Sequence, residues 1–179
     1  MIYTAEQEAL RPLLGPANIS PDSFLATDYL NHFNEIVMTL EMAVDMPELM
    51  EDAQEWKPLT YAQHFEQSGF ADKELVIEAY EMAPVSIRDS FEETVDRLNH
   101  MVMVSLKFLD EALKNEIGLN EPQILDLANK RALMHDLLAQ LNGLIHSGGK
   151  EPEPSMCEDV EGDASDAQDA QDAIDQLFD

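Results

Sequence analysis

Residues 87–113 read IRDSFEETVDRLNHMVMVSLKFLDEAL, and this stretch decides the fold class. Large apolar side chains recur in it at steps of three or four residues, in the series Ile87, Phe91, Val95, Leu98, Val102, Leu106, Leu109 and Leu113. Because an α-helix completes a turn about every 3.6 residues, this series lies along one face of a single helix. The stretch therefore predicts an amphipathic helix of about eight turns whose apolar face needs neighbouring helices to cover it.

Two further long helices are predicted, one before and one after this stretch. Ser20-Pro21 is expected to open the first, with a hydroxyl cap and a proline in the first turn. Its apolar stripe comprises Leu25, Tyr29, Phe33, Ile36, Val37, Leu40 and Val44. Asn120 is expected to cap the second, which ends at the Gly148-Gly149 pair. The residues of this helix expected to face inward are Ile124, Leu127, Ala128, Met134, Leu138, Leu141 and Ile145.

Shorter helices are expected between and before the long ones. Thr4 with Gln7, and Thr60 with Gln63, have the spacing of a capping box. A further helix is predicted from Asp72 to Met82, and one or two turns within residues 48–55. Since no alternating strand pattern competes, we predict an all-α fold, an antiparallel helical bundle formed by residues 1–148.

Composition and charge limit the classes of partner. The net charge of −27 repels nucleic-acid phosphates and anionic lipids, so we expect neither a nucleic-acid partner nor a membrane partner. The only cysteine is Cys157, which rules out a disulfide within one chain and favours a reducing compartment. The first 14 residues include Glu6 and Glu8 and lack the basic region of a signal peptide. We therefore expect a cytoplasmic protein.

The sequence changes character after the last predicted helix. Residues 149–169 contain Glu151-Pro-Glu-Pro followed mainly by Asp, Ala, Ser and Gln, which predicts a disordered acidic linker. Residues 170–179 then place Ile174, Leu177 and Phe178 at helical spacings i, i+3 and i+4. So short a segment does not form a stable helix alone. We interpret it as an amphipathic segment that folds against a groove on a protein partner.

Residues 171–178, QDAIDQLF, resemble the QDEIDALL peptide that opens the flagellar switch protein FliM and the short acidic-apolar tail of the chemotaxis phosphatase CheZ. Phe178 replaces a leucine, and Ala170 stands where a serine often precedes the motif. In both families this peptide binds the response regulator CheY. The resemblance implies a bacterial signalling protein that docks a CheY-like receiver domain. The positions identical to the motif are Gln171, Asp172, Ile174, Asp175 and Leu177.

The same resemblance draws attention to Asp136 and Gln140. CheZ proteins place an Asp and a Gln four residues apart on one helix, and residues 135–140, HDLLAQ, match their QDLTGQ motif at Asp136, Leu137 and Gln140. By this resemblance Gln140 orients a water for in-line attack on an aspartyl phosphate, and Asp136 positions residues of the partner. The receiver domain supplies Mg²⁺, and no cofactor of the chain's own is expected. The alternative is a solvated helix face, which leaves open whether the chain is an enzyme.

A metal-binding helical bundle is a second alternative. Asp28 with His32, and Asp96 with His100, each place a carboxylate and an imidazole one helical turn apart, and Glu35 follows His32 by three residues. The Glu-x-x-His pairs of ferritin-like sites are missing, so we assign no metal ligands.

A helical adaptor with an unrelated protein partner is a third alternative. The long apolar stripes can be covered within one chain or across a homodimer, and the sequence leaves this open. Trp56 and Phe65, in the loop-rich middle of the chain, are expected to be core residues beneath the loops or a surface anchor.

Overall fold

The computed structural model describes residues 2–114 and 119–148, so the predicted linker and partner-binding segment lie outside the described residues. Within these ranges every regular element is helical, as the sequence predicts. The elements are α1 (Ala5–Leu14), the 3-10 helices η1 (Gly15–Ala17) and η2 (Thr27–Leu30), α2 (Asn31–Met42), α3 (Leu49–Glu55), α4 (Tyr61–Gln67), α5 (Lys73–Glu81), α6 (Val85–Leu113) and α7 (Glu121–Ser147).

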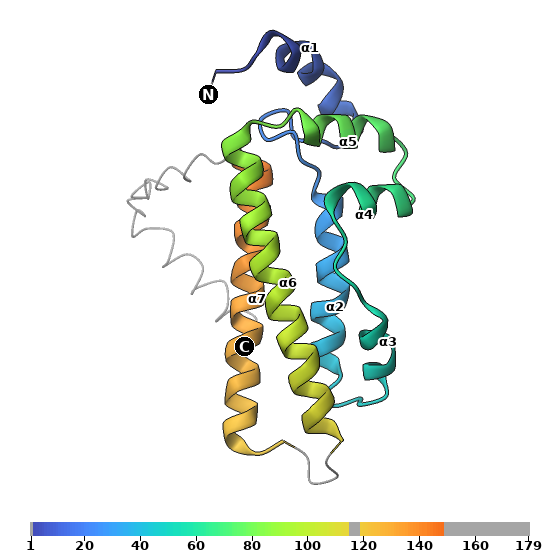
Figure 1. The fold of residues 1–179 in the computed structure, drawn as a ribbon, viewed down its shortest axis with the longest axis vertical. Helices are drawn as coiled ribbons and strands as arrows, with labels where there is room; N and C mark the ends of the chain where they lie inside the picture. The colour runs from blue at the N-terminus through green and yellow to red at the C-terminus, as the bar shows by residue number, and fades with distance from the viewer. Residues whose placement is uncertain (1, 115–118, 149–179) are drawn as a thin grey trace, which may run out of the picture.

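The two longest helices, α6 and α7, lie side by side along most of the molecule, and α2 packs beside them (Figure 1). The short helices α3 and α4 cover α2 and the segment before it, while α5 lies next to α4. Helix α1 crosses one end of the molecule against α5. None of the helices in the described ranges combines the length and apolarity needed to cross a bilayer.

The apolar series of α6 forms the centre of the core, as predicted. Seven of its members are buried, and Leu113 at the helix end is partly buried against the same core. Burying one such side chain contributes about 1.5–3 kcal/mol, so this face accounts for much of the packing between α6 and its neighbours. The buried members are Ile87, Phe91, Val95, Leu98, Val102, Leu106 and Leu109.

The first predicted long helix is shorter than its apolar stripe indicates. Instead of opening a helix, Ser20-Pro21 begins a tight loop, and α2 starts only at Asn31. Phe24 is fully buried with φ of 67°, a left-handed conformation that an α-helix cannot accommodate. The loop is fixed to α7 because the buried Ser23 hydroxyl donates a 2.6 Å hydrogen bond to the carbonyl of Ile145.

Helix α7 has the predicted ends and most of the predicted buried face. Asn120 caps it in a capping box with Gln123, and Gly148 ends it with φ of 57°. Leu137, which was not predicted, is fully buried, and the predicted Leu138 is partly buried against the core. Ile124, which was expected to face inward, is 53% exposed. Apolar residues occur around much of this helix, so periodicity alone does not select the face that packs. The fully packed positions are Met134, Leu137, Leu141 and Ile145.

The shorter helices agree with their local signals. Thr4 with Gln7 and Thr60 with Gln63 form the two predicted capping boxes. Helix α5 begins directly after Asp72 as expected, although the side chain of Asp72 does not bond to the helix backbone. The middle of the chain is packed rather than open, since Phe65 is fully buried and Trp56 is partly buried against the core.

Candidate functional site

The predicted catalytic pair lies on the exposed side of α7. Asp136 and Gln140 are both exposed and stand one helical turn apart, as their spacing requires. Beside them, Nε2 of His135 lies 2.7 Å from Oε1 of Glu41 on α2. Arg131 approaches the same carboxylate at 3.8 Å. Both side chains are therefore accessible to a partner protein. Their exposure equally fits the alternative, in which they are ordinary solvated residues of the helix surface.

The predicted partner-binding residues cannot be located in the fold, because they lie outside the described residues. They are Gln171, Asp172, Ile174, Asp175, Leu177 and Phe178.

An imidazole–indole cluster joins α2 to the segment after α3. The ring of His32 stacks on Trp56 with centroids 4.9 Å apart and an interplanar angle of 21°. The Trp56 indole N–H donates a 3.1 Å hydrogen bond to the carbonyl of His32. Burial lowers the pKa of His32 to about 4, the neighbouring His64 lowers it as well, and a hydrogen bond to the backbone of Lys57 opposes both. His32 is therefore neutral at pH 7.

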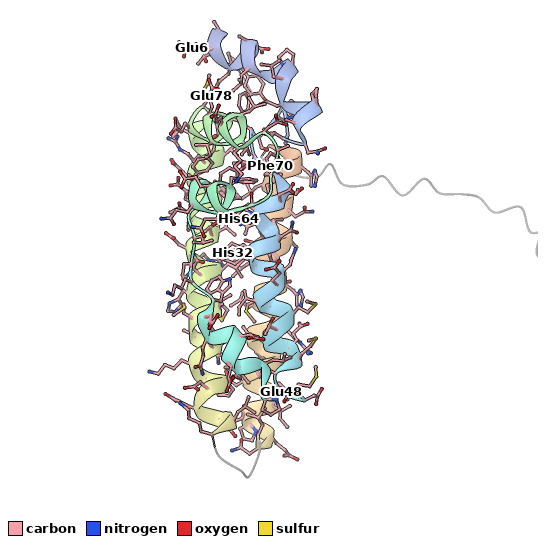
Figure 2. All side chains as sticks on the ribbon, turned by 90° about the vertical axis from the view of Figure 1, so that its right-hand side faces the viewer. Glu6, His32, Glu48, His64, Phe70 and Glu78 are labelled. Atoms are coloured by element: carbon pink, nitrogen blue, oxygen red, sulfur yellow. The ribbon has the colours of Figure 1, made fainter. Side chains whose placement is uncertain are left out.

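His64, on α4, completes this cluster. Its ring centroid lies 5.9 Å from that of His32, and Figure 2 shows the two histidines as neighbours. Burial lowers the pKa of His64, against a hydrogen bond to the backbone of Asp28 and the charges of Asp28 and Glu35. The Nε2 atom of His32 is buried and has no hydrogen-bond partner among the described residues. The cluster is thus a neutral, stacked junction between elements.

The carboxylate and imidazole pairs weighed as metal ligands do not meet at one point. His32 faces Trp56 and His64, whereas Asp96 and His100 line an open groove of about 410 Å³ between α6 and α7. In residues 2–114 and 119–148, no three His, Cys, Asp or Glu side chains come together in a way that could hold a metal ion. The described residues therefore offer no support for the metal-binding alternative.

A pocket that sequence reasoning missed lies between α6 and the segment that joins α3 to α4. We call it the aromatic pocket; its volume is about 290 Å³. Four rings line it: Tyr29, Tyr61, Tyr80 and Phe91. Tyr61 stacks on Tyr80 at 4.5 Å with an interplanar angle of 14°, and the Tyr29 ring lies 5.2 Å from Tyr61 and 5.6 Å from Phe91.

The hydroxyls of these tyrosines hold the wall of the aromatic pocket in place. The Tyr29 hydroxyl donates to the carbonyl of Leu59 at 2.8 Å, and the buried Tyr61 hydroxyl accepts a 2.7 Å bond from the N–H of Ala26. At the rim, the Tyr80 hydroxyl donates to Oε1 of Glu92 at 2.6 Å. Burial is the main reason that the pKa of each of these tyrosines is raised, so all three stay protonated at neutral pH.

The polar lining of the aromatic pocket is acidic. Glu92 and Asp96, one turn apart on α6, line it together with Asn99, and its lining includes no Lys, Arg or His among the described residues. The Oδ1 atom of Asn99 is buried and, within residues 2–114 and 119–148, accepts no hydrogen bond. One sequence signal includes two of its residues: Asp96 and Asn99 belong to an Asp-x-x-Asn-His pattern that occurs at residues 28–32 and again at residues 96–100.

Comparison with family models, with curated proteins and with solved structures finds nothing that matches this chain.

Proposed function

We propose that this chain is a signalling regulator, an antiparallel helical bundle that docks a receiver-domain response regulator through residues 170–179. The observation that carries the proposal is the identity of five positions, Gln171, Asp172, Ile174, Asp175 and Leu177, with the CheY-binding peptide of FliM. Ile174, Leu177 and Phe178 form one apolar face when the segment is helical, which suits the helix-in-groove mode of peptide recognition.

The attachment point of the tail suits a tether. Helix α7 ends at Gly148, where a Cβ atom would lie 3.2 Å from the carbonyl oxygen of Asp22, so this end is packed against the 20–25 loop. If residues 149–169 form the disordered linker that their composition predicts, it would span about 25 Å, from about 5–6 Å multiplied by the square root of its length. Asp136 lies about 18 Å along the helix from Gly148, at about 1.5 Å per residue. A regulator held by the tail can therefore reach Asp136 and Gln140 at a high effective concentration.

The proposal extends to aspartyl-phosphate hydrolysis at this face of α7. Gln140 orients the attacking water, Asp136 positions groups of the regulator, and the regulator supplies both the phosphoryl group and Mg²⁺. The exposure of both side chains supports this reading, since a phosphatase pair has to enter the partner's active site.

The docking proposal is tested by measuring binding of purified receiver domains, with and without a phosphoryl mimic, to the full chain. Replacing Leu177 and Phe178 together by Ala removes two large apolar contacts, each worth about 1.5–3 kcal/mol, and should weaken binding at least about 100-fold. Gln176→Ala, directly before Leu177 but off the apolar face, is the matched control and should change binding less than about threefold. Circular dichroism should show the same helix content in all three proteins. Equal affinities for the double variant and the parent contradict the proposal.

The hydrolysis step is tested separately by single-turnover dephosphorylation. Gln140→Ala should slow loss of phosphate from the regulator by about tenfold or more while leaving the dissociation constant unchanged. Asn142→Ala, exposed two residues farther along α7, serves as the control and should keep the parent rate. If the Gln140 variant keeps the parent rate, the chain binds the regulator without acting as its phosphatase.

A further inference from the structure

We propose that residues 170–179 dock, within the same chain, into the open groove between α6 and α7. Docking of this segment is a property of the chain alone and needs no other protein. It deepens the proposed function, on which only its regulatory consequence rests: a docked segment is withheld from the regulator. This α6–α7 groove has a volume of about 410 Å³ and is lined by Glu93, Asp96, Arg97, His100, Met101, Leu133 and Leu137.

The α6–α7 groove presents apolar side chains that the fold leaves accessible. Leu133, on the α7 wall, is 38% exposed, and Met101, on the α6 wall, is only partly buried. Val104 and Phe108 follow Met101 at i+3 and i+7, so the apolar stripe continues along the same side of α6. Val104 is 37% exposed, and Phe108 is partly buried. Such a stripe suits an amphipathic helix that lies along it.

The segment offers the complementary face. Ile174, Leu177 and Phe178 have the i, i+3 and i+4 spacing of one helical face. A helix this short is not stable alone, so it needs a surface that covers this face. Docking in the α6–α7 groove removes apolar surface of the segment and of the groove from water together.

The charge distribution favours this part of the bundle for an acidic segment. Residues 97–131 contain five of the ten Lys and Arg residues of the chain but only five of its 37 Asp and Glu residues. Arg97 is exposed and has no carboxylate within 4.0 Å in the described part of the chain, so it can pair with an Asp of the segment. Glu93 and Asp96 oppose docking at one end of the groove. Val104 lies about 12 Å along α6 from Asp96, beyond the screening length of about 8 Å at physiological salt.

The groove is within reach of the segment. Leu133 lies about 22 Å along α7 from Gly148, at about 1.5 Å per residue, and the predicted linker would span about 25 Å. Tethering at this length favours the groove of the same chain over that of a second copy. Leu133 precedes Asp136 by three residues, so the groove adjoins the proposed catalytic pair.

Paramagnetic relaxation in the full chain, with no regulator present, tests the docking. Cys157→Ser removes the only cysteine, and Gln176→Cys carries a nitroxide off the apolar face. The methionine methyl groups are labelled with carbon-13. Met101 is the reporter, and Met103, 48% exposed on the opposite side of α6, is the control. The effect falls with the sixth power of distance and α6 is about 10 Å across, so Met101 should relax about tenfold faster than Met103.

Equal effects on the two methyl groups overturn the proposal. A mixture of isotope-labelled chains without nitroxide and nitroxide chains without isotope should show no enhancement. Enhancement of the same size in the mixture assigns the groove to the segment of a second copy and also overturns the proposal.

Variants of the groove connect the docking to this surface. Leu133→Glu places an unpaired charge against the docked apolar face and should reduce the Met101 enhancement about fivefold or more. Leu125→Glu makes the same change at a 64% exposed position of α7 outside the groove and should keep the parent value. Melting curves check that both variants fold. If the two variants behave alike, the assignment of the groove is refuted.

Regulator binding separates this inference from the proposed function. If the segment also binds a receiver domain, Leu133→Glu should tighten that binding about threefold or more, because it frees the competent form. Loss of the Met101 enhancement without a change in regulator affinity counts against the proposed function and leaves the docking in place. A chain that binds the regulator but shows no Met101 enhancement overturns the docking alone.

Discussion

Replacing His32 by Phe should change how the stability of this protein depends on pH. Burial lowers the pKa of His32 to about 4 in the folded chain, against 6.5 as its ordinary value. As the pH falls below 6.5, the unfolded chain takes up this proton before the folded chain does, and the free energy of unfolding decreases. The loss begins near pH 6.5 and is complete near pH 4. Above pH 6.5 both states are neutral at this residue, and it contributes no pH dependence.

The size of the effect follows from the two pKa values. The difference between 6.5 and about 4 corresponds to about 3 kcal/mol, at 1.36 kcal/mol for each pH unit. His32 is only partly buried, so solvent screening reduces this contribution, and we expect about 1.5 kcal/mol. Phe keeps an aromatic ring on Trp56 but cannot be protonated, so the variant should lack this contribution.

Urea denaturation at pH 7.0 and pH 4.5, followed by helical circular dichroism, measures the effect. The parent should lose about 1.5 kcal/mol more than the His32→Phe variant between the two pH values, because carboxylate titration acts on both proteins alike. His100→Phe, at an exposed position of α6, controls for removal of a histidine and should behave like the parent. If the parent and the His32→Phe variant lose the same free energy within about 0.3 kcal/mol, the stacked junction does not hold His32 neutral and the reasoning fails.

Two further predictions concern helix ends and can be read from thermal or urea unfolding. Gly148→Ala should destabilise the protein by about 1–2 kcal/mol, because Gly148 has φ of 57° and a Cβ atom there would lie 3.2 Å from the Asp22 carbonyl. Gly143→Ala, inside the same helix with open space around its Cβ, should instead stabilise the protein by about 1 kcal/mol. If both variants change the free energy of unfolding in the same direction, this account is contradicted. Thr60→Ala should cost about 1 kcal/mol by removing the capping box with Gln63, while Thr60→Ser should stay within about 0.5 kcal/mol of the parent; an Ala variant as stable as the Ser variant would show that the cap is dispensable.

The helical fold class and most helix ends were predictable because their signals are local. A capping box needs only a hydroxyl or amide side chain and a residue three positions later, as at Thr4, Thr60 and Asn120. The apolar period of α6 likewise lies within one stretch of chain. The prediction failed at Ser20, which opens a loop instead of a helix. This loop is held by a contact distant in sequence, because Ser23 donates a hydrogen bond to the carbonyl of Ile145, 122 residues away.

The two candidate sites differ in the same way: one lies on a single helix, and the other depends on contacts between elements. The spacing of Asp136 and Gln140 is a property of one helix, so their common face on α7 follows from the sequence. The exposure of that face depends on how α7 packs, and a role in catalysis remains a prediction. The aromatic pocket joins Tyr29, Tyr61 and Phe91, which come from three segments far apart in the chain. Helical periodicity describes which residues share a face within one element, but the partners of that face depend on how the elements pack. Only the packing of η2, α4 and α6 brings these rings around one cavity and leaves Asn99 without a donor.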